Sequence, residues 1–263
     1  MIRLFYAIFL VLFCLTTYAG TIDPKKTDQE YVNYGNKHAC VIKLLGHTND
    51  EKNTPYVASC VMISPYYALT AAHVVKGTIT QYAIYDGVPH ACLIAAIHSD
   101  FNSKKMGYND IAILRLSKPI NLDFYPDLYT DNDEVEKVCS ISGFGHTGTL
   151  STGYDRQKDD GKKRAGSNII SSLEKHLLIC SSTDRATSME FIICPGDSGG
   201  GLFIDRKLAG INSCVFANDG RTNSDYGDNS GHTRVSIFAD WIKESVEKIE
   251  EMVKIIKREK LGD

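Results

Sequence analysis

The chain has 263 residues, 43% of them hydrophobic and 23% charged, with a formal net charge of −3. These values are ordinary for a soluble globular protein, and they allow a core large enough to fold without a cofactor. The slight negative charge argues against a nucleic-acid partner, because nucleic-acid-binding domains carry a clustered basic face. The short basic run at residues 162–164 is expected to be a solvated loop tip.

The N-terminus is typical of a secretory signal peptide. Arg3 precedes a short apolar run from Leu4 to Leu15, and small side chains follow at Thr17 and Ala19. The run is too short for a stable membrane span, so we expect cleavage after Ala19 and removal of residues 1–19. The mature protein is then predicted to be secreted, or periplasmic if its source is a Gram-negative bacterium.

Residues 20–36 are predicted to be a propeptide or an ordered N-terminal extension, followed by the main domain at residues 37–263. From about His38 to Ser236, short β-branched and apolar runs alternate with polar turns, a pattern that favours an all-β sandwich or barrel. The expected strands are Cys40–Leu45, Ala58–Ile63, Tyr67–Ala72, Tyr82–Tyr85, Ala91–Ile97, Ile111–Leu116, Val138–Ile141, Ile192–Cys194, Gly201–Ile204 and Leu208–Ile211.

Two stretches depart from this strand pattern. Residues 147–167 are polar and glycine-rich with almost no apolar anchor, and they are expected to form a long mobile surface loop. Residues 237–260 are expected to form an amphipathic helix, because apolar side chains recur there at steps of three and four. Those apolar residues are Phe238, Trp241, Ile242, Val246, Ile249, Met252, Val253 and Ile256.

Three segments far apart in the sequence carry side chains suited to nucleophilic catalysis. His73 ends the strand Leu69-Thr-Ala-Ala-His73, and Asp110 precedes the apolar strand Ile-Ala-Ile-Leu-Arg-Leu. Ser198 lies in Cys194-Pro-Gly-Asp-Ser198-Gly-Gly-Gly, where glycines allow backbone N–H groups to approach a ligand. Each segment alone also has an ordinary structural explanation, as a surface histidine, a strand-start acid or a glycine-rich turn.

In the order His, Asp, Ser, these segments resemble the chymotrypsin-like (trypsin-type) serine protease family. The resemblance covers roughly Cys40 to Ile242 and implies two six-stranded antiparallel β-barrels, at about residues 37–135 and 136–236, with the site in the cleft between them. The C-terminal helix at 237–260 would follow the second barrel. Further matching segments are Ile97-His-Ser-Asp-Phe101, Cys139-Ser-Ile-Ser-Gly-Phe-Gly145, Gly210-Ile-Asn-Ser213 and Thr233-Arg-Val235 before Trp241.

The resemblance implies a secreted serine endopeptidase that hydrolyses peptide bonds through an acyl-enzyme intermediate. Ser198 would be the nucleophile, His73 the general base and Asp110 the acid that orients the histidine. The backbone N–H groups of Gly196 and Ser198 would form the oxyanion hole, and Ser213 would support Asp110. The expected partners are protein or peptide substrates and protein inhibitors, and neither a metal nor a cofactor is expected.

The specificity pocket implied by the resemblance consists of Ile192, Ser213, Val215 and Ser230. None of these side chains is an acid that could pair with Arg or Lys, so a small or medium uncharged P1 residue is expected. His232 could favour acidic P1 residues if it pointed into the pocket, although a packing role is the prediction.

The cysteines do not follow the usual disulfide pattern of the family. Eight cysteines less Cys14 of the signal leave seven, an odd number. Val74 and Ile204 occupy positions where the family has half-cystines. A Cys40–Cys60 bridge is one candidate, and a bridge among Cys180, Cys194 and Cys214 is another.

Two further questions stay open at this level. In the family, a new apolar N-terminus pairs with the acid before the nucleophile, here Asp197. Residues 31–35 are the nearest candidate terminus, and an internal cation or polar group is the alternative partner for Asp197. A homologue that has lost catalysis and serves as a binding module is the main competing function. An esterase of the Gly-x-Ser-x-Gly type is a poorer one, because its triad order differs.

Overall fold

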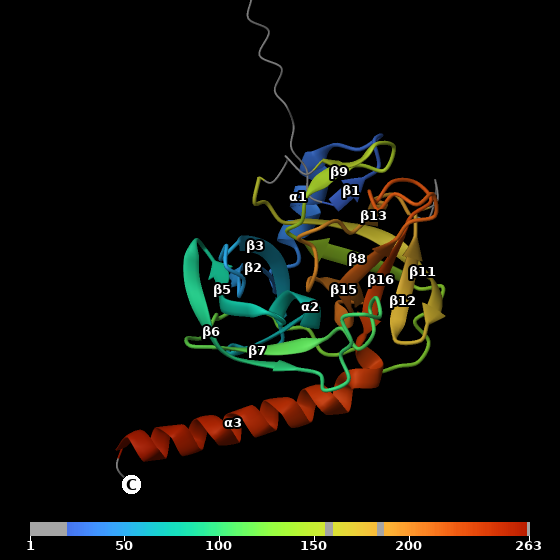
Figure 1. Cartoon of the computed structure of the whole chain (residues 1–263). Coiled ribbons are helices and arrows are strands. Elements are labelled where there is room, and N and C mark those ends of the chain that lie inside the picture. The colour runs from blue at the N-terminus through green and yellow to red at the C-terminus, as the bar shows by residue number, and fades with distance from the viewer. Residues whose placement is uncertain (1–19, 156–159, 183–186, 262–263) are drawn as a thin grey trace, which may run out of the picture.

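The computed structural model describes residues 20–155, 160–182 and 187–261, so the predicted signal peptide lies outside the described residues. Two closed antiparallel barrels of six strands each lie side by side (Figure 1). The first has the order β2-β3-β4-β7-β6-β5, with β2 (Val41–Thr48), β3 (Pro55–Met62), β4 (Tyr67–Thr70), β5 (Thr78–Tyr85), β6 (Val88–Ile97) and β7 (Ala112–Leu116). The second has the order β11-β12-β16-β15-β14-β8, with β8 (Val138–Gly143), β11 (Arg164–Glu174), β12 (Leu177–Ser181), β14 (Gly201–Ile204), β15 (Lys207–Phe216) and β16 (Asn229–Arg234). The predicted fold class is confirmed.

The strand pleat explains why each barrel closes around an apolar core. Alternate side chains of a strand point to opposite faces, so one face of each strand fills the barrel interior. In the first barrel the register places Leu44, Cys60, Ala68 and Leu114 on the same inner face, and all four are fully buried. Closure removes exposed sheet edges and holds the loops between strands in fixed positions.

The C-terminus forms the predicted helix. A short 3₁₀ helix, η1 (Val235–Phe238), leads into α3 (Ala239–Leu261), which extends away from the barrels as a single long helix (Figure 1). Its first half packs on the first barrel through Ile242 and Ile249, whereas Ile255 and Ile256 in its second half are exposed. Among the described helices, none has the length and apolar content needed to cross a lipid bilayer.

The segment at residues 20–36 is an ordered part of the fold. It forms β1 (Gly20–Ile22), all three residues of which are buried, and α1 (Asp28–Asn36). The helix begins after Thr27, whose backbone N–H is bound by the Glu30 carboxylate at 2.9 Å. Residues 31–35, the candidate terminus, lie inside α1 in this structure and not at an inserted chain end.

The prediction of a long mobile loop at residues 147–167 is wrong for the described part of that stretch. β1 joins a second, four-stranded sheet of order β10-β9-β1-β13, built with β9 (Thr147–Thr149), β10 (Gly153–Asp155) and β13 (Phe191–Ile192). The expected solvated tip at residues 162–164 is also wrong, because Arg164 is fully buried at the start of β11. Both predictions failed because polar side chains that find partners inside the protein have no apolar signature in the sequence.

Neither candidate disulfide is present in the described part of the chain. All seven cysteines in the described residues are thiols. Cys60 lies opposite Ile42 in the β2–β3 pair, so Cys40 is not its cross-strand neighbour. Cys180 instead contacts Cys139, with the two sulfur atoms 3.7 Å apart and on strands separated by β11.

Candidate active site

His73 and Asp110 meet at the cleft edge of the first barrel. His73 lies in α2 (Ala72–Val75), a single helical turn after β4, and Asp110 comes just before β7. The Nδ1 atom of His73 is 2.7 Å from Asp110 Oδ2, and the backbone N–H of His73 donates to Oδ1 at 2.8 Å. One carboxylate therefore fixes both the ring and the backbone of the histidine.

Two residues from the second barrel complete the surroundings of Asp110. The Ser213 hydroxyl donates to Asp110 Oδ2 at 2.6 Å, and Thr233 Oγ1 donates to the Asp110 carbonyl at 2.9 Å. Burial by itself would raise the pKa of Asp110, but the hydrogen bonds from His73 and Ser213 outweigh it and hold that pKa below its usual value. Asp110 is thus kept as a carboxylate, able to stabilise a charged His73.

Ser198 faces His73 across the cleft. The two side chains line one catalytic hollow of about 300 Å³ together with Gly196 and Pro195. Within the described part of the chain, no hydrogen bond joins Ser198 Oγ to His73 Nε2. Such contacts are often long in unliganded sites and tighten when substrate binds. The structure therefore brings His73, Asp110 and Ser198 to one place.

The loop that ends at Ser198 contains the two backbone N–H groups predicted to form the oxyanion hole, and both residues line the catalytic hollow. The Pro195 carbonyl accepts a 2.7 Å hydrogen bond from the His146 N–H. Because a trans peptide directs its C=O and N–H to opposite sides, the Gly196 N–H points away from His146. The backbone at Gly196 has φ +97°, which glycine adopts without strain. Among the described residues, neither Gly196 nor Ser198 uses its N–H in a hydrogen bond, so both donors are available to an oxyanion.

Asp197, next to the nucleophile, is completely buried. Its carboxylate accepts 2.7 Å and 2.8 Å hydrogen bonds from the N–H groups of Gly145 and Cys194. Burial raises the pKa of Asp197 to about 7, although these two hydrogen bonds oppose the rise. A Cβ atom at Gly143 or Gly145 would come within 2.6 Å of this carboxylate, which explains why both positions are glycine.

The predicted specificity pocket corresponds to a hollow of about 260 Å³ beside Ser198. Two of the four predicted pocket residues, Ser213 and Val215, line it. Its other walls are neutral side chains that the sequence does not single out, namely Tyr154, Ile193, Cys194, Pro195, Cys214, Thr222 and Ser224.

The remaining two predicted pocket residues lie elsewhere. Ile192 belongs to β13, is fully buried and pairs with Thr21 of β1. Ser230 is buried and its hydroxyl contacts Nε2 of His232 at 2.9 Å. The other ring nitrogen of His232 contacts Asn212 Oδ1 at 2.9 Å, and burial lowers its pKa to about 3. His232 is therefore a neutral interior residue that packs rather than selecting substrates.

Comparison with known proteins identifies the family. The sequence model of the trypsin family matches residues 32–242, most of the chain. The chain belongs to the trypsin family. This trypsin-family member is 26% identical over 223 residues to kallikrein 1-related peptidase b24 of Mus musculus, covering 73% of this chain and 81% of that protein. It is 28% identical over 204 residues to trypsin I-P1 of Gallus gallus, covering 69% and 76%.

Solved structures share the same fold. A structure of HL collagenase aligns with a TM-score of 0.66 at 19% identity, covering 88% of this chain and 98% of that chain. Neuropsin, a serine protease expressed in the limbic system of mouse brain, aligns with a TM-score of 0.61 at 19% identity, covering 81% and 96%. The resemblance to serine proteases that the motifs predict is confirmed at the level of family and fold.

Proposed function

We propose that this trypsin-family protein is a secreted serine endopeptidase with His73, Asp110 and Ser198 as its catalytic triad. One observation carries the proposal. Asp110 holds the His73 ring on one side, and the ring shares a hollow with Ser198 and the unused Gly196 N–H on the other. A base, a nucleophile and an oxyanion donor that converge in this way suit acyl transfer.

In the proposed reaction, Ser198 Oγ attacks the substrate carbonyl carbon while its proton passes to His73 Nε2. The carbonyl π electrons move onto oxygen, and the N–H groups of Gly196 and Ser198 stabilise that oxyanion. As the carbonyl re-forms, the C–N bond breaks and His73 returns the proton to the leaving amine. Water then repeats the sequence on the acyl-enzyme and regenerates Ser198.

The proposed substrates are proteins or peptides with a small or medium uncharged P1 side chain, and protein inhibitors could occupy the same cleft. The support is the wall of the proposed specificity pocket, a hollow of roughly 260 Å³ whose lining has no charged side chain among the described residues. A buried basic P1 group would find no carboxylate partner among those residues, and an unpaired buried charge is costly.

We also propose that residues 1–19 are removed and that residues 20–36 stay on the mature protein. The burial of Gly20–Ile22 and the N–H of Gly20, which donates to the His146 carbonyl at 2.6 Å, support this boundary. His146 directly follows Gly145, the residue whose N–H binds the Asp197 carboxylate. N-terminal sequencing of the active protein tests the boundary, and a terminus beyond residue 36 would contradict it.

The enzymatic proposal is tested with a fluorophosphonate probe and a peptide library that varies P1. Wild type should be labelled and should cleave after uncharged residues, Ser198→Ala should do neither, and the surface control Ser117→Ala should match wild type. A folded wild type that fails to react would favour the non-catalytic binding module. Preference for Arg at P1 would overturn the specificity assignment.

A further inference from the structure

The short strand β1 lies between the two walls of the specificity pocket. On one side Thr21 and Ile22 pair with β13, and residues 193–195, which follow β13, line the pocket. On the other side β1 pairs with β9, which pairs with β10, where Tyr154 also lines the pocket. Loss of β1 from this sheet would leave both walls without their central hydrogen-bonding partner.

A strand of three residues near a chain end does not stay in place through its own ladder alone, because ordering each residue costs conformational entropy. The helix α1 supplies the missing attachment. Tyr31 of α1 is fully buried, and its hydroxyl donates to the Glu190 carbonyl at 2.9 Å. The same hydroxyl accepts a hydrogen bond from the Asp23 N–H, directly after β1.

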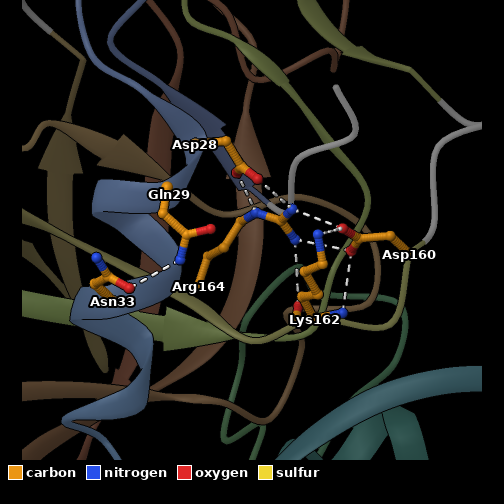
Figure 2. Close-up of polar contacts among 6 residues, drawn as sticks. All are labelled: Asp28, Gln29, Asn33, Asp160, Lys162 and Arg164. Carbon is orange, nitrogen blue, oxygen red and sulfur yellow. Dashed lines mark hydrogen bonds and ion pairs between the residues drawn. The ribbon is translucent and has the colours of Figure 1, made fainter. Parts of the chain in front are cut away.

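Arg164 clamps α1 to the second barrel (Figure 2). Its guanidinium donates from Nε and Nη2 to the two carboxylate oxygens of Asp28 at 2.5 and 2.9 Å. It also donates from Nη1 and Nη2 to the carboxylate oxygens of Asp160 at 2.9 and 2.8 Å. Lys162 holds Asp160 in turn, through its backbone N–H at 3.0 Å and its ammonium at 3.2 Å.

Because this clamp is buried, the loss of any one of its charges is expected to be destabilising. The Arg164 side chain has no exposed surface, whereas Asp28 and Asp160 are each 15% exposed. Removing one partner of a buried ion pair leaves charge that is poorly compensated, which is far more damaging than losing a surface pair. The two planar carboxylates on one guanidinium also fix its direction, which a flexible Lys ammonium would not do.

Arg164 is joined to the active-site loop as well. It starts β11 opposite Gly143 of β8, and its carbonyl accepts a 3.0 Å hydrogen bond from the Ser142 hydroxyl. Gly143 lies against the Asp197 carboxylate. The clamp therefore connects α1 to the same backbone that supports the residue before the nucleophile.

We propose that Arg164 is a positioning residue for substrate binding, because its clamp on Asp28 anchors α1 and thereby keeps β1 between the walls of the specificity pocket. The effect on substrate binding rests on the proposed function, whereas the anchoring of β1 does not. A purely stabilising ion pair would behave differently, since its loss would loosen the whole molecule evenly.

The test compares Asp28→Asn, Arg164→Gln and wild type by amide hydrogen exchange. In both variants, exchange in residues 147–155 and 187–195 should rise at least about tenfold, while the first barrel at residues 41–116 keeps its protection. Glu134→Gln is the matched control, because Glu134 makes a similarly bidentate, buried pair with Arg234 at 2.7 and 2.8 Å. This control should leave the pocket segments unchanged. Asp28→Glu, which keeps the charge, should restore most of their protection.

Enzyme kinetics supply the second readout. Asp28→Asn should raise KM about tenfold for a preferred peptide while kcat changes less than threefold, because the triad stands on other elements. Unchanged exchange at residues 147–155 and 187–195, or an equal rise over both barrels, would overturn the proposal. If Arg164→Gln does not fold, Asp28→Asn carries the test alone. Exchange needs no catalysis, so an inactive wild type would contradict the proposed function without deciding the role of the clamp.

Discussion

The Ser59 hydroxyl donates a 3.0 Å hydrogen bond to the Gly196 carbonyl, and it accepts one of the same length from the Phe144 N–H. Ser59 belongs to β3 of the first barrel, whereas Gly196 and Phe144 belong to the second. The Ser59 N–H also donates to the Ser198 carbonyl at 2.9 Å. One buried residue thus joins the two barrels directly behind the proposed oxyanion hole.

Replacing Ser59 with alanine is therefore expected to disturb the chemical step more than substrate binding. We predict that Ser59→Ala lowers kcat about tenfold, equivalent to ~1.4 kcal/mol in the barrier, with KM within twofold of wild type. Steady-state kinetics with one good peptide substrate measures both constants. Ser117→Ala, at an exposed position, is the control. An equal loss of kcat in both variants would show that the effect does not arise at the oxyanion hole.

The hydrogen bonds around Asp110 predict a large effect of a small substitution. Asp110→Asn keeps the size of the side chain but places an amide against His73 Nδ1, which favours the wrong tautomer. We expect kcat to fall about 10⁴-fold while the fold persists, as checked by kinetics and thermal unfolding. A loss below tenfold in the folded variant would mean that another group orients His73.

Asp197 predicts an unusual dependence of stability on pH. Its folded pKa of about 7 exceeds the usual value of about 3.9, so the folded state holds this proton more tightly than the unfolded state. The resulting stability is fully present below about pH 4 and is lost as the pH rises through 7, at up to ~1.4 kcal/mol per pH unit. Asp197→Asn should lack this decline.

Urea unfolding of wild type and Asp197→Asn between pH 4.5 and 8 measures the difference. His232 acts in the opposite sense, because its lowered pKa of about 3 costs stability as the pH falls below the usual histidine value. His232 is present in both proteins, so its effect cancels in the difference between the two curves. Parallel curves would show that Asp197 is ionised throughout the range.

The first barrel was predictable from the sequence because each of its strands contains an apolar run. The second barrel was only partly predictable, since β11 and β16 bury polar side chains. Asn168 of β11 donates to the Phe191 carbonyl at 3.3 Å, and His232 of β16 contacts Asn212 and Ser230. Strands whose buried side chains are polar and hydrogen-bonded lack the hydrophobic periodicity by which strands are predicted from sequence.

The same limit applies to the site. His73, Asp110 and Ser198 lie in recognisable motifs, whereas Ser59 lies in none, and its contacts between the two barrels could not be predicted from the sequence. At the pocket wall, a shift of one residue in the sequence decides whether a side chain lines the pocket. Ile192 and Ile193 are neighbours of the same type, yet only Ile193 lines the pocket, because successive side chains of an extended chain face opposite ways.

That distinction yields the last prediction, a change of specificity through Ile193. A carboxylate placed at this wall would face a P1 side chain, so Ile193→Asp should raise kcat/KM for Lys or Arg at P1 at least tenfold relative to an apolar P1. Ile193→Asn has nearly the same shape without the charge, and it should show no such gain. The measurement is kcat/KM for matched peptides that differ only at P1. Because Ile192 is fully buried in β13 beside β1, Ile192→Asp should instead lower stability without creating basic specificity. A gain of basic specificity from Ile192→Asp but not from Ile193→Asp would place the floor of the pocket at Ile192.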